Sequence, residues 1–253
     1  MVLAASKKNV KFVGEDLYKT ILTYDDYNQK KNIFGEEKGT SGSSSFYIYG
    51  EGFSAENLTF ENSSGPVGQA VAVWAGGDKL IFTNCRFLGF QDTLYTYGGN
   101  NRQYYKNCYI EGTVDFIFGS STAWFENCTI FCKKAGYITA ASTADTTKFG
   151  YVINKCKIKG DAPANSFYLG RPWRPYAKVV YLNCELPDLI YPEGWNNWSK
   201  ESNEETAYYA EYKSTGKGAL GQKRVKWSHQ LTDDEYKAYT LENVFRGWNP
   251  EEK

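Results

Sequence analysis

The chain has 253 residues, enough for one large domain or two small ones. Its 29 Lys and Arg residues balance its 29 Asp and Glu residues, so the net charge gives no reason to expect nucleic acid or an anionic membrane as a partner. No apolar run approaches the roughly 18 residues of a membrane span. The apolar start, Met1-Val2-Leu3-Ala4-Ala5, is too short for a signal peptide, so we expect that any export signal was removed or never existed.

A recurring step of Asn or Lys followed by Cys or Leu runs through most of the chain. It recurs with a spacing of roughly 20–28 residues, within the range of structural repeats. The copies are Asn57-Leu58, Asn84-Cys85, Asn107-Cys108, Asn127-Cys128, Lys155-Cys156 and Asn183-Cys184. We expect each step to sit within a short strand of alternating character, such as 80–87 or 151–158. A repeat of this kind, with Gly, Asn and Ser between its strands, predicts an all-β solenoid. A sandwich or propeller is the alternative, but either would favour hairpin turns.

The cysteines fit the same repeat. Five of the six occupy the second position of the step, and we expect them to stack inward as small hydrophobic residues with free thiols. Disulfides are the alternative. The one close pair, Cys128 and Cys132, has no matching second pair, so no metal site is predicted.

Beyond residue 185 the pattern changes. Residues 195–198 predict an irregular loop and residues 208–212 a further strand. The sequence Thr232-Asp233-Asp234-Glu235 has the form of a capping box and predicts a short helix running toward Val244. We expect this tail to cover one side or end of the solenoid, where strand edges are otherwise unpaired.

Two aspartates are the best candidates for chemistry. The only histidine, His229, lies in the tail, and no Gly-x-Ser-x-Gly motif accompanies it, so we interpret it as structural. Asp92 and Asp115 are separated by the same interval as Cys85 and Cys108, which is the local repeat. In a parallel solenoid, residues one coil apart stack at the strand spacing of roughly 4.8 Å. We therefore expect these two carboxylates to be neighbours on one face.

Three further polar residues fall on the same face. Gln69 precedes Asp92 by that same interval, which places it one coil earlier, and Gln91 adjoins Asp92. Arg171 follows Asp115 at a distance that we interpret as two coils of roughly 28 residues each. The aspartates could simply cap turns or pair with nearby cations. Two carboxylates this close cannot both ionise easily, however, and a guanidinium beside one would keep it ionised while the other holds its proton. The glutamine amides could then donate to a developing oxyanion.

Four stretches, in this order along the chain, resemble the signature motifs of the pectin methylesterases (pectinesterases). They are Gln69-Ala70-Val71-Ala72-Val73, Gln91-Asp92-Thr93-Leu94-Tyr95, Asp115-Phe116-Ile117-Phe118-Gly119 and Leu169-Gly170-Arg171-Pro172-Trp173. The similarity runs from about Lys8 to Trp248. It implies a right-handed parallel β-helix, and hydrolysis of the C6 methyl esters of galacturonate in pectin (homogalacturonan) with release of methanol. No cofactor or metal is implied.

The resemblance also implies roles for individual residues. Asp115 resembles the nucleophile, and Asp92 resembles the acid that protonates methanol and then the base that activates water. Arg171 resembles the residue that fixes and ionises the nucleophile, whereas Gln69 and Gln91 resemble the oxyanion stabilisers. Three aromatic positions resemble sugar-contacting rings: Tyr95, Phe118 and Trp173. Trp74 departs from the pattern, because many members have arginine there.

The expected molecule is a single catalytic domain over 1–253, a β-helix with a short C-terminal helix packed on it. From the resemblance, we expect it to lack the first N-terminal coil of the family. We expect a monomer, secreted to an extracellular or periplasmic location. Two alternatives stay open: a β-helix glycosidase or lyase that cuts the pectin chain, and a non-catalytic pectin-binding relic. The relic would account for an aromatic content of 17%, although Tyr-rich strands alone also explain it.

Overall fold

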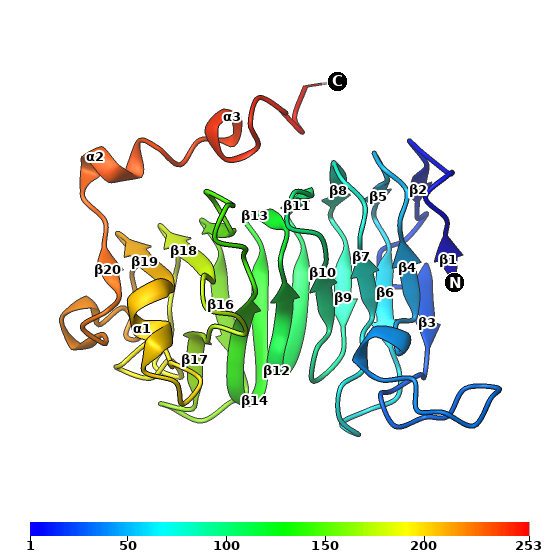
Figure 1. The fold of residues 1–253 in the computed structure, drawn as a ribbon, viewed down its shortest axis with the longest axis horizontal. Coiled ribbons are helices and arrows are strands. Elements are labelled where there is room, and N and C mark those ends of the chain that lie inside the picture. The colour runs from blue at the N-terminus through cyan, green and yellow to red at the C-terminus, as the bar shows by residue number, and fades with distance from the viewer. Residues whose placement is uncertain (253) are drawn as a thin grey trace.

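The chain winds into a stack of coils built from short strands (Figure 1). The structure, a computed structural model, describes residues 1–252. Every pairing between its strands is parallel, and strands such as β6, β8 and β10 pair with the strand one coil before and the strand one coil after them. This is the predicted parallel β-helix, and it excludes the sandwich and propeller alternatives, whose neighbouring strands would be joined by antiparallel hairpins.

One side of the stack is a nine-stranded sheet. Its strands, in spatial order, are β2 (Lys11–Val13), β5 (Ser54–Glu56), β8 (Leu80–Thr83), β11 (Arg102–Lys106), β13 (Thr122–Glu126), β15 (Tyr151–Asn154), β18 (Lys178–Leu182), β19 (Tyr208–Tyr212) and β20 (His229–Gln230). The predicted strand over 208–212 is therefore confirmed as β19.

An eleven-stranded sheet forms the rest of the wall in two rows. The first row contains β3 (Ile21–Tyr24), β6 (Thr59–Asn62), β9 (Arg86–Leu88) and β16 (Lys157–Gly160). The second row contains β1 (Val2–Leu3), β4 (Phe46–Ile48), β7 (Val73–Ala75), β10 (Leu94–Thr96) and β17 (Phe167–Gly170). Two long strands, β12 (Tyr109–Gly119) and β14 (Thr129–Ala141), pass through both rows and join them.

The Asn-Cys steps form corners between strands. We predicted them inside single strands, and this was wrong: β8 ends at Thr83 and β9 begins at Arg86. The asparagine of the step has a positive φ, 51° at Asn84 and 52° at Asn127, and this left-handed conformation turns the chain from one sheet into the next. Asparagine suits the corner because its short polar side chain tolerates that conformation.

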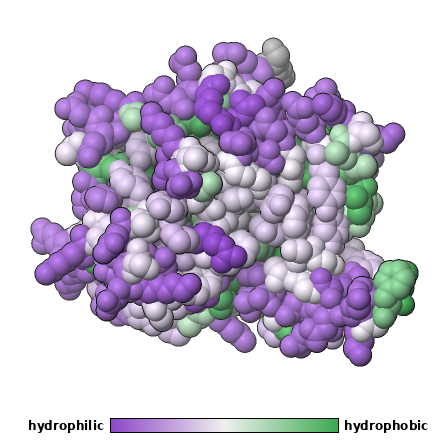
Figure 2. All heavy atoms as spheres, viewed as in Figure 1, coloured by the Kyte–Doolittle hydropathy of each residue, from purple (hydrophilic) through white to green (hydrophobic). Residues whose placement is uncertain are grey.

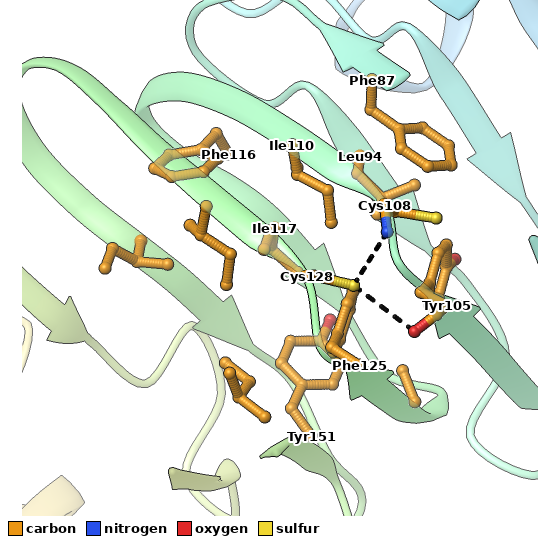
Figure 3. Packing of buried hydrophobic residues seen from close by; sticks show 14 of the residues in the cluster. Phe87, Leu94, Tyr105, Cys108, Ile110, Phe116, Ile117, Phe125, Cys128 and Tyr151 are labelled. Atoms are coloured by element: carbon orange, nitrogen blue, oxygen red, sulfur yellow. Dashed lines mark hydrogen bonds between the residues drawn. The ribbon is translucent and has the colours of Figure 1, made fainter. Parts of the chain in front are cut away.

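The interior is filled by apolar side chains, and those of successive coils pack on one another (Figure 3). All six cysteines are buried and free, as predicted. Those of neighbouring coils are in contact, since the backbone N–H of Cys108 donates to Sγ of Cys128 over 3.4 Å. Aromatic rings stack in the same way, with the ring centroids of Phe82 and Tyr105 4.9 Å apart and those of Tyr105 and Phe125 4.6 Å apart.

The C-terminal tail covers the end and then one side of the nine-stranded sheet (Figure 1). The predicted capping box is present at Thr232, but the helix stops after one turn. Instead of one helix toward Val244 there are two short ones, α2 (Asp233–Tyr236) and α3 (Leu241–Val244), each with its own threonine N-cap. A second N-cap at Thr240 has extended backbone angles, which ends any continuous helix.

The remaining short elements are η1 (Thr40–Gly42), α1 (Ser202–Thr206) and η2 (Gly221–Lys223). His229 lies in β20 and stacks on Tyr208, with ring centroids 4.8 Å apart, in keeping with its structural interpretation. Among residues 1–252, no helix has the length and apolar character required to cross a membrane.

Candidate active site

Asp92 and Asp115 lie on neighbouring coils, as their interval in the sequence predicts. Leu94 pairs with Ile117 in the sheet, and the backbone N–H of Asp92 donates to the carbonyl of Val114 over 3.1 Å. Both aspartates have a positive φ, 65° at Asp92 and 53° at Asp115. Aspartate, like the asparagines at the corners, tolerates this left-handed conformation because its polar side chain is short. The left-handed turn at each position directs two acidic side chains to the same cleft.

Close packing behind the aspartates holds these turns. The hydroxyl of Thr93 donates to the carbonyl of Glu111 over 2.9 Å and ties the Asp92 turn to the next coil. Gly112 lies where a side chain has no room, because a Cβ there would come within 2.2 Å of Phe116 Cβ and 2.6 Å of the carbonyl of Phe90. The carboxylates are therefore presented by a tightly packed backbone.

Arg171 binds Asp115 with both prongs of its guanidinium. Nε donates to Oδ1 over 2.9 Å and Nη2 donates to Oδ2 over 2.7 Å. The predicted two coils between them have unequal lengths, because the coil from Ile117 to Thr139 is shorter than the coil from Thr139 to Gly170. The interpretation as two equal coils was therefore wrong. Arg171 lies just past the level of Asp115 and reaches back to it.

Two aromatic rings pack against the guanidinium of Arg171. The ring of Tyr137 lies 3.8 Å from Cζ of Arg171, and the ring of Trp198 lies 3.7 Å from it. Trp198 belongs to the predicted irregular loop and has a φ of 60°. Its backbone N–H donates to Oδ1 of Asn196 over 2.8 Å. The ring pair therefore keeps Arg171 oriented toward Asp115, and sequence reasoning did not find either ring.

Burial and the charges of the site set the two carboxyl groups apart. Asp92 is 7% exposed and Asp115 is 6% exposed. Burial raises the pKa of Asp92 well above its usual value, and the negative charge of Asp115 raises it further. Burial also raises the pKa of Asp115, but there the two hydrogen bonds and the charge of Arg171 oppose the rise. Asp115 is thus the group favoured to be ionised, and Asp92 the group favoured to hold a proton.

Gln69 and Gln91 lie on neighbouring coils beside the aspartates and line the same cleft. Gln69 is one coil earlier, as predicted, but its backbone partner is Gln91 and not Asp92. A residue that sequence reasoning missed orients the Gln69 amide: Nδ2 of Asn28 donates to Oε1 of Gln69 over 2.6 Å. The Gln69 oxygen is therefore engaged, which leaves its NH2 group free to donate into the cleft.

The cleft has a volume of about 410 Å³ and is walled by aromatic rings. All eight predicted site residues line it, together with four residues not predicted: Thr40, Ser41, Ala140 and Trp198. Tyr95 stacks on Phe118 with centroids 4.2 Å apart, and Trp173 meets both rings edge-on. The described residues contain no cluster of three or more His, Cys, Asp or Glu side chains that could hold a metal ion.

Comparisons with known proteins agree with this geometry. A profile of the pectinesterase family matches residues 1–248. Pectinesterase 31 of Arabidopsis thaliana is 44% identical over 243 residues, covering 92% of this chain and 75% of the relative. A probable pectinesterase/pectinesterase inhibitor of the same plant is 36% identical over 95% of this chain, which spans only 42% of that relative. A crystal structure of a pectin methylesterase in complex with a hexasaccharide superposes with a TM-score of 0.88 at 31% identity, covering 100% of this chain and 86% of that one.

Proposed function

The chain belongs to the pectinesterase family of carboxylic ester hydrolases, and we propose that its cleft removes C6 methyl esters from pectin with Asp115 as the nucleophile. The observation that carries this assignment is the two-pronged Arg171–Asp115 contact with Asp92 one coil away. It places a carboxyl group favoured to be ionised beside one whose raised pKa favours holding its proton.

In the first half of the reaction, Asp115 attacks the ester. A carboxylate oxygen forms a bond to C6, and the carbonyl electron pair moves onto oxygen. The NH2 groups of Gln69 and Gln91 donate to this oxyanion. The tetrahedral intermediate then collapses, the bond from C6 to the methoxy oxygen breaks, and Asp92 gives its proton to the departing methanol.

In the second half, water releases the product. Asp92, now a carboxylate, takes a proton from water as the oxygen of that water bonds to C6 of the acyl-enzyme. Collapse of the second tetrahedral intermediate breaks the bond between C6 and Asp115. The galacturonate leaves as a free acid, Asp115 is again a carboxylate held by Arg171, and Asp92 is again protonated.

The shape of the cleft supports a polymeric substrate. It is an open, ring-walled groove, and a structurally similar pectin methylesterase binds a hexasaccharide. Tyr95, Phe118 and Trp173 offer apolar faces to sugar rings. We also propose that the chain forms one catalytic domain, because the residues that line the cleft are drawn from Thr40 to Trp198, and that it acts as a monomer. A polymer of the cell wall as substrate favours secretion to an extracellular or periplasmic location.

The test is methanol release from highly methylated pectin, with polygalacturonate as the substrate that has no ester to cleave. Methanol is expected from pectin alone, and Asp115→Asn should release none. The exposed Asp145 provides a matched control, since Asp145→Asn makes the same chemical change away from the cleft. Absence of methanol with the folded wild-type protein would overturn the proposal. The alternatives predict other products: new reducing ends from a glycosidase, ultraviolet-absorbing unsaturated ends from a lyase, and binding without turnover from a relic. The match to pectinesterases does not favour them.

A further inference from the structure

Two aromatic rings cover the two faces of the Arg171 guanidinium, and one short segment of the chain supports both. The rings of Tyr137 and Trp198 lie 3.8 Å and 3.7 Å from Cζ of Arg171, too close for both to occupy one face. Trp198 ends the segment 191–198, which we call the clamp. Tyr191 begins the clamp and is connected to Tyr137 by a stack of tyrosines.

The stack of tyrosines runs across three coils. Tyr137 in β14 is the register partner of Tyr168 in β17, and their ring centroids are 5.4 Å apart. Tyr191 lies on the next coil, where its backbone N–H donates to the carbonyl of Phe167 over 2.8 Å. Its ring stacks on that of Tyr168 with centroids 4.5 Å apart. One face of Arg171 is therefore supported by three rings, the outermost of which belongs to the clamp.

A buried ion pair fastens the clamp at its Tyr191 end. Arg224 donates to Glu211 through Nε over 2.6 Å and through Nη2 over 3.1 Å, and the two residues are 8% and 2% exposed. Its Nη1 donates to the carbonyls of Tyr191 and Pro192 over 3.2 Å and 3.0 Å. Gly194 packs so closely that a Cβ there would come within 2.5 Å of Cδ of Arg224. Arg224 therefore holds the backbone of the clamp in one place.

The contacts of the stack lead inward to Arg171 and not into the substrate groove. Four residues of this assembly do not line the catalytic cleft: Tyr137, Tyr168, Tyr191 and Arg224. Figure 2 shows largely hydrophilic surface over α1, which follows the clamp in the chain, and over the loops beside it. A surface of that kind is not typical of a binding face. The packing of the clamp is therefore best explained by what it does to Arg171.

We propose that Tyr191 and Arg224 are positioning residues, which keep both prongs of the Arg171 guanidinium on Asp115 by fixing the clamp. The inference rests on the proposed function of Asp115 as the nucleophile. Ordering a side chain as long as that of arginine costs entropy, and rings packed on both of its faces offset that cost. If the clamp is loosened, the two hydrogen bonds to Asp115 form for a smaller fraction of the time.

The ionisation of Asp115 reports the state of the clamp. Burial raises the pKa of Asp115, and the hydrogen bonds and charge of Arg171 oppose that rise. Two other titratable groups interact with this pair. Burial and the charge of Asp115 raise the pKa of Asp92, and burial raises the pKa of Tyr209 in β19 well above its usual value, so both hold their protons longer. A loosened Arg171 should therefore raise the pKa of Asp115 and move the acid limb of the rate to higher pH.

The experiment compares Tyr191→Ala with wild type in initial rates of methanol release against pH. We expect the acid limb of kcat to move to higher pH by up to about one unit, as for the loss of a stacked ring pair, while KM and the rate above the limb stay unchanged. Tyr191→Phe keeps the ring and should have the wild-type profile. Tyr18→Ala removes an exposed ring that packs on Arg86 at 4.7 Å, and it is the matched control.

A titration without substrate separates failure of the clamp from failure of the proposed activity. The NMR signal of the Asp115 carboxyl carbon, assigned by its absence in Asp115→Asn, should titrate at higher pH in Tyr191→Ala than in wild type. Arg224→Lys should shift it in the same direction, because an ammonium lacks the planar fork that binds Glu211 and the clamp together. If Arg224→Lys does not fold, Tyr191→Ala still decides, since Tyr191 is only half-buried.

Two results would overturn the positioning role. One is the same pKa of Asp115 in wild type and Tyr191→Ala. The other is a fall of Tm or kcat in Tyr191→Ala with no shift of the acid limb, which would show that the ring only stabilises the fold. Either result leaves the esterase assignment untouched, because that assignment depends on methanol release by the wild type.

Discussion

The corner asparagines and the cleft aspartates use the same backbone device for opposite purposes. Asn84, Asn107 and Asn127 at the corners, and Asp92 and Asp115 in the cleft, all have a φ between 51° and 65°. At these corners the side chains are exposed and neutral, and they bind each other: Nδ2 of Asn127 donates to Oδ1 of Asn107 over 2.7 Å. In the cleft the side chains are buried acids, and the charge of Asp115 raises the cost of ionising Asp92.

The difference shows where this fold stores its strain. A ladder of amides satisfies its own donors and acceptors, so a corner stabilises the solenoid at each coil. A stacked pair of carboxyl groups instead destabilises the fold, and the positive charge of Arg171 offsets the repulsion between them. Proteins retain such destabilising groups at sites where the chemistry requires them. Changes in the cleft should therefore alter activity strongly and leave the fold intact, whereas changes at the corners should alter stability alone.

The largest effect is expected from Asp115→Asn. The amide cannot attack the ester, so kcat should fall about 10⁴-fold or more. Asparagine tolerates the left-handed conformation at this position, so the fold should persist. Initial rates of methanol release measure the loss of kcat, and circular dichroism shows whether the variant is folded. Activity near that of wild type would disprove the role of Asp115 as nucleophile.

Asp92→Asn should reduce kcat by about 10²–10⁴-fold, the usual contribution of a general acid. The wild-type rate should also have an alkaline limb, because Asp92 must hold its proton when methanol leaves and its raised pKa places that loss above the usual carboxyl range. Rate profiles of wild type and variant against pH decide the matter: the limb should vanish in Asp92→Asn. If the rate of Asp92→Asn still falls at high pH as that of wild type does, the titrating group is not Asp92.

Gln69→Ala should lose about 10²–10³-fold in kcat if the Gln69 amide is one of the oxyanion donors. Asn28→Ala removes only the group that orients this amide, so we expect a smaller loss of about tenfold, with KM unchanged. Asn100→Ala, which changes an exposed asparagine in the turn after β10, serves as the control. Equal losses in Gln69→Ala and Asn28→Ala would show that Asn28 does more than orient its neighbour.

A corner asparagine should affect stability and not rate. Asn127→Ala loses the left-handed preference, about 1–2 kcal/mol, and a ladder hydrogen bond worth about 1 kcal/mol. Asn165 is a matched control, because it is exposed and has a φ of 52° but lies outside the corner ladder. Asn165→Ala should therefore lose only the left-handed preference, about 1–2 kcal/mol of stability. Chemical denaturation of both variants measures the difference, and a change in kcat for Asn127→Ala would contradict the separation.

The smallest effect concerns the pH dependence of stability. Folding raises the pKa of Asp92, so the folded protein binds more protons than the unfolded chain at pH values above about 3.9. This group's contribution to stability is complete below that pH and is lost as the pH rises through its folded pKa. Asp92→Asn should remove this dependence, so its Tm should fall less than that of wild type between pH 4 and neutrality, a comparison that thermal scans provide. Parallel curves would indicate that Asp92 titrates normally.

The sequence by itself determined the coil and the pair of acids on it. Residues one coil apart must stack in a parallel solenoid, so an interval equal to the local repeat was enough to bring Asp92 next to Asp115. The corners could also have been found. Inward residues occur at Leu80 and Phe82 and then at Cys85 and Phe87, and the longer step from Phe82 to Cys85 interrupts the alternation where the chain turns.

Only the tertiary structure decided what surrounds the two acids. The coils that carry Arg171 differ in length, because their loops follow no period, and so spacing could not fix how the guanidinium meets Asp115. Asn28 and Trp198 reach the site from loops outside the strand repeat, one far ahead of Gln69 in the chain and the other well beyond Arg171. A contact between a loop and a strand depends on the path of the loop, which leaves no periodic trace in the sequence.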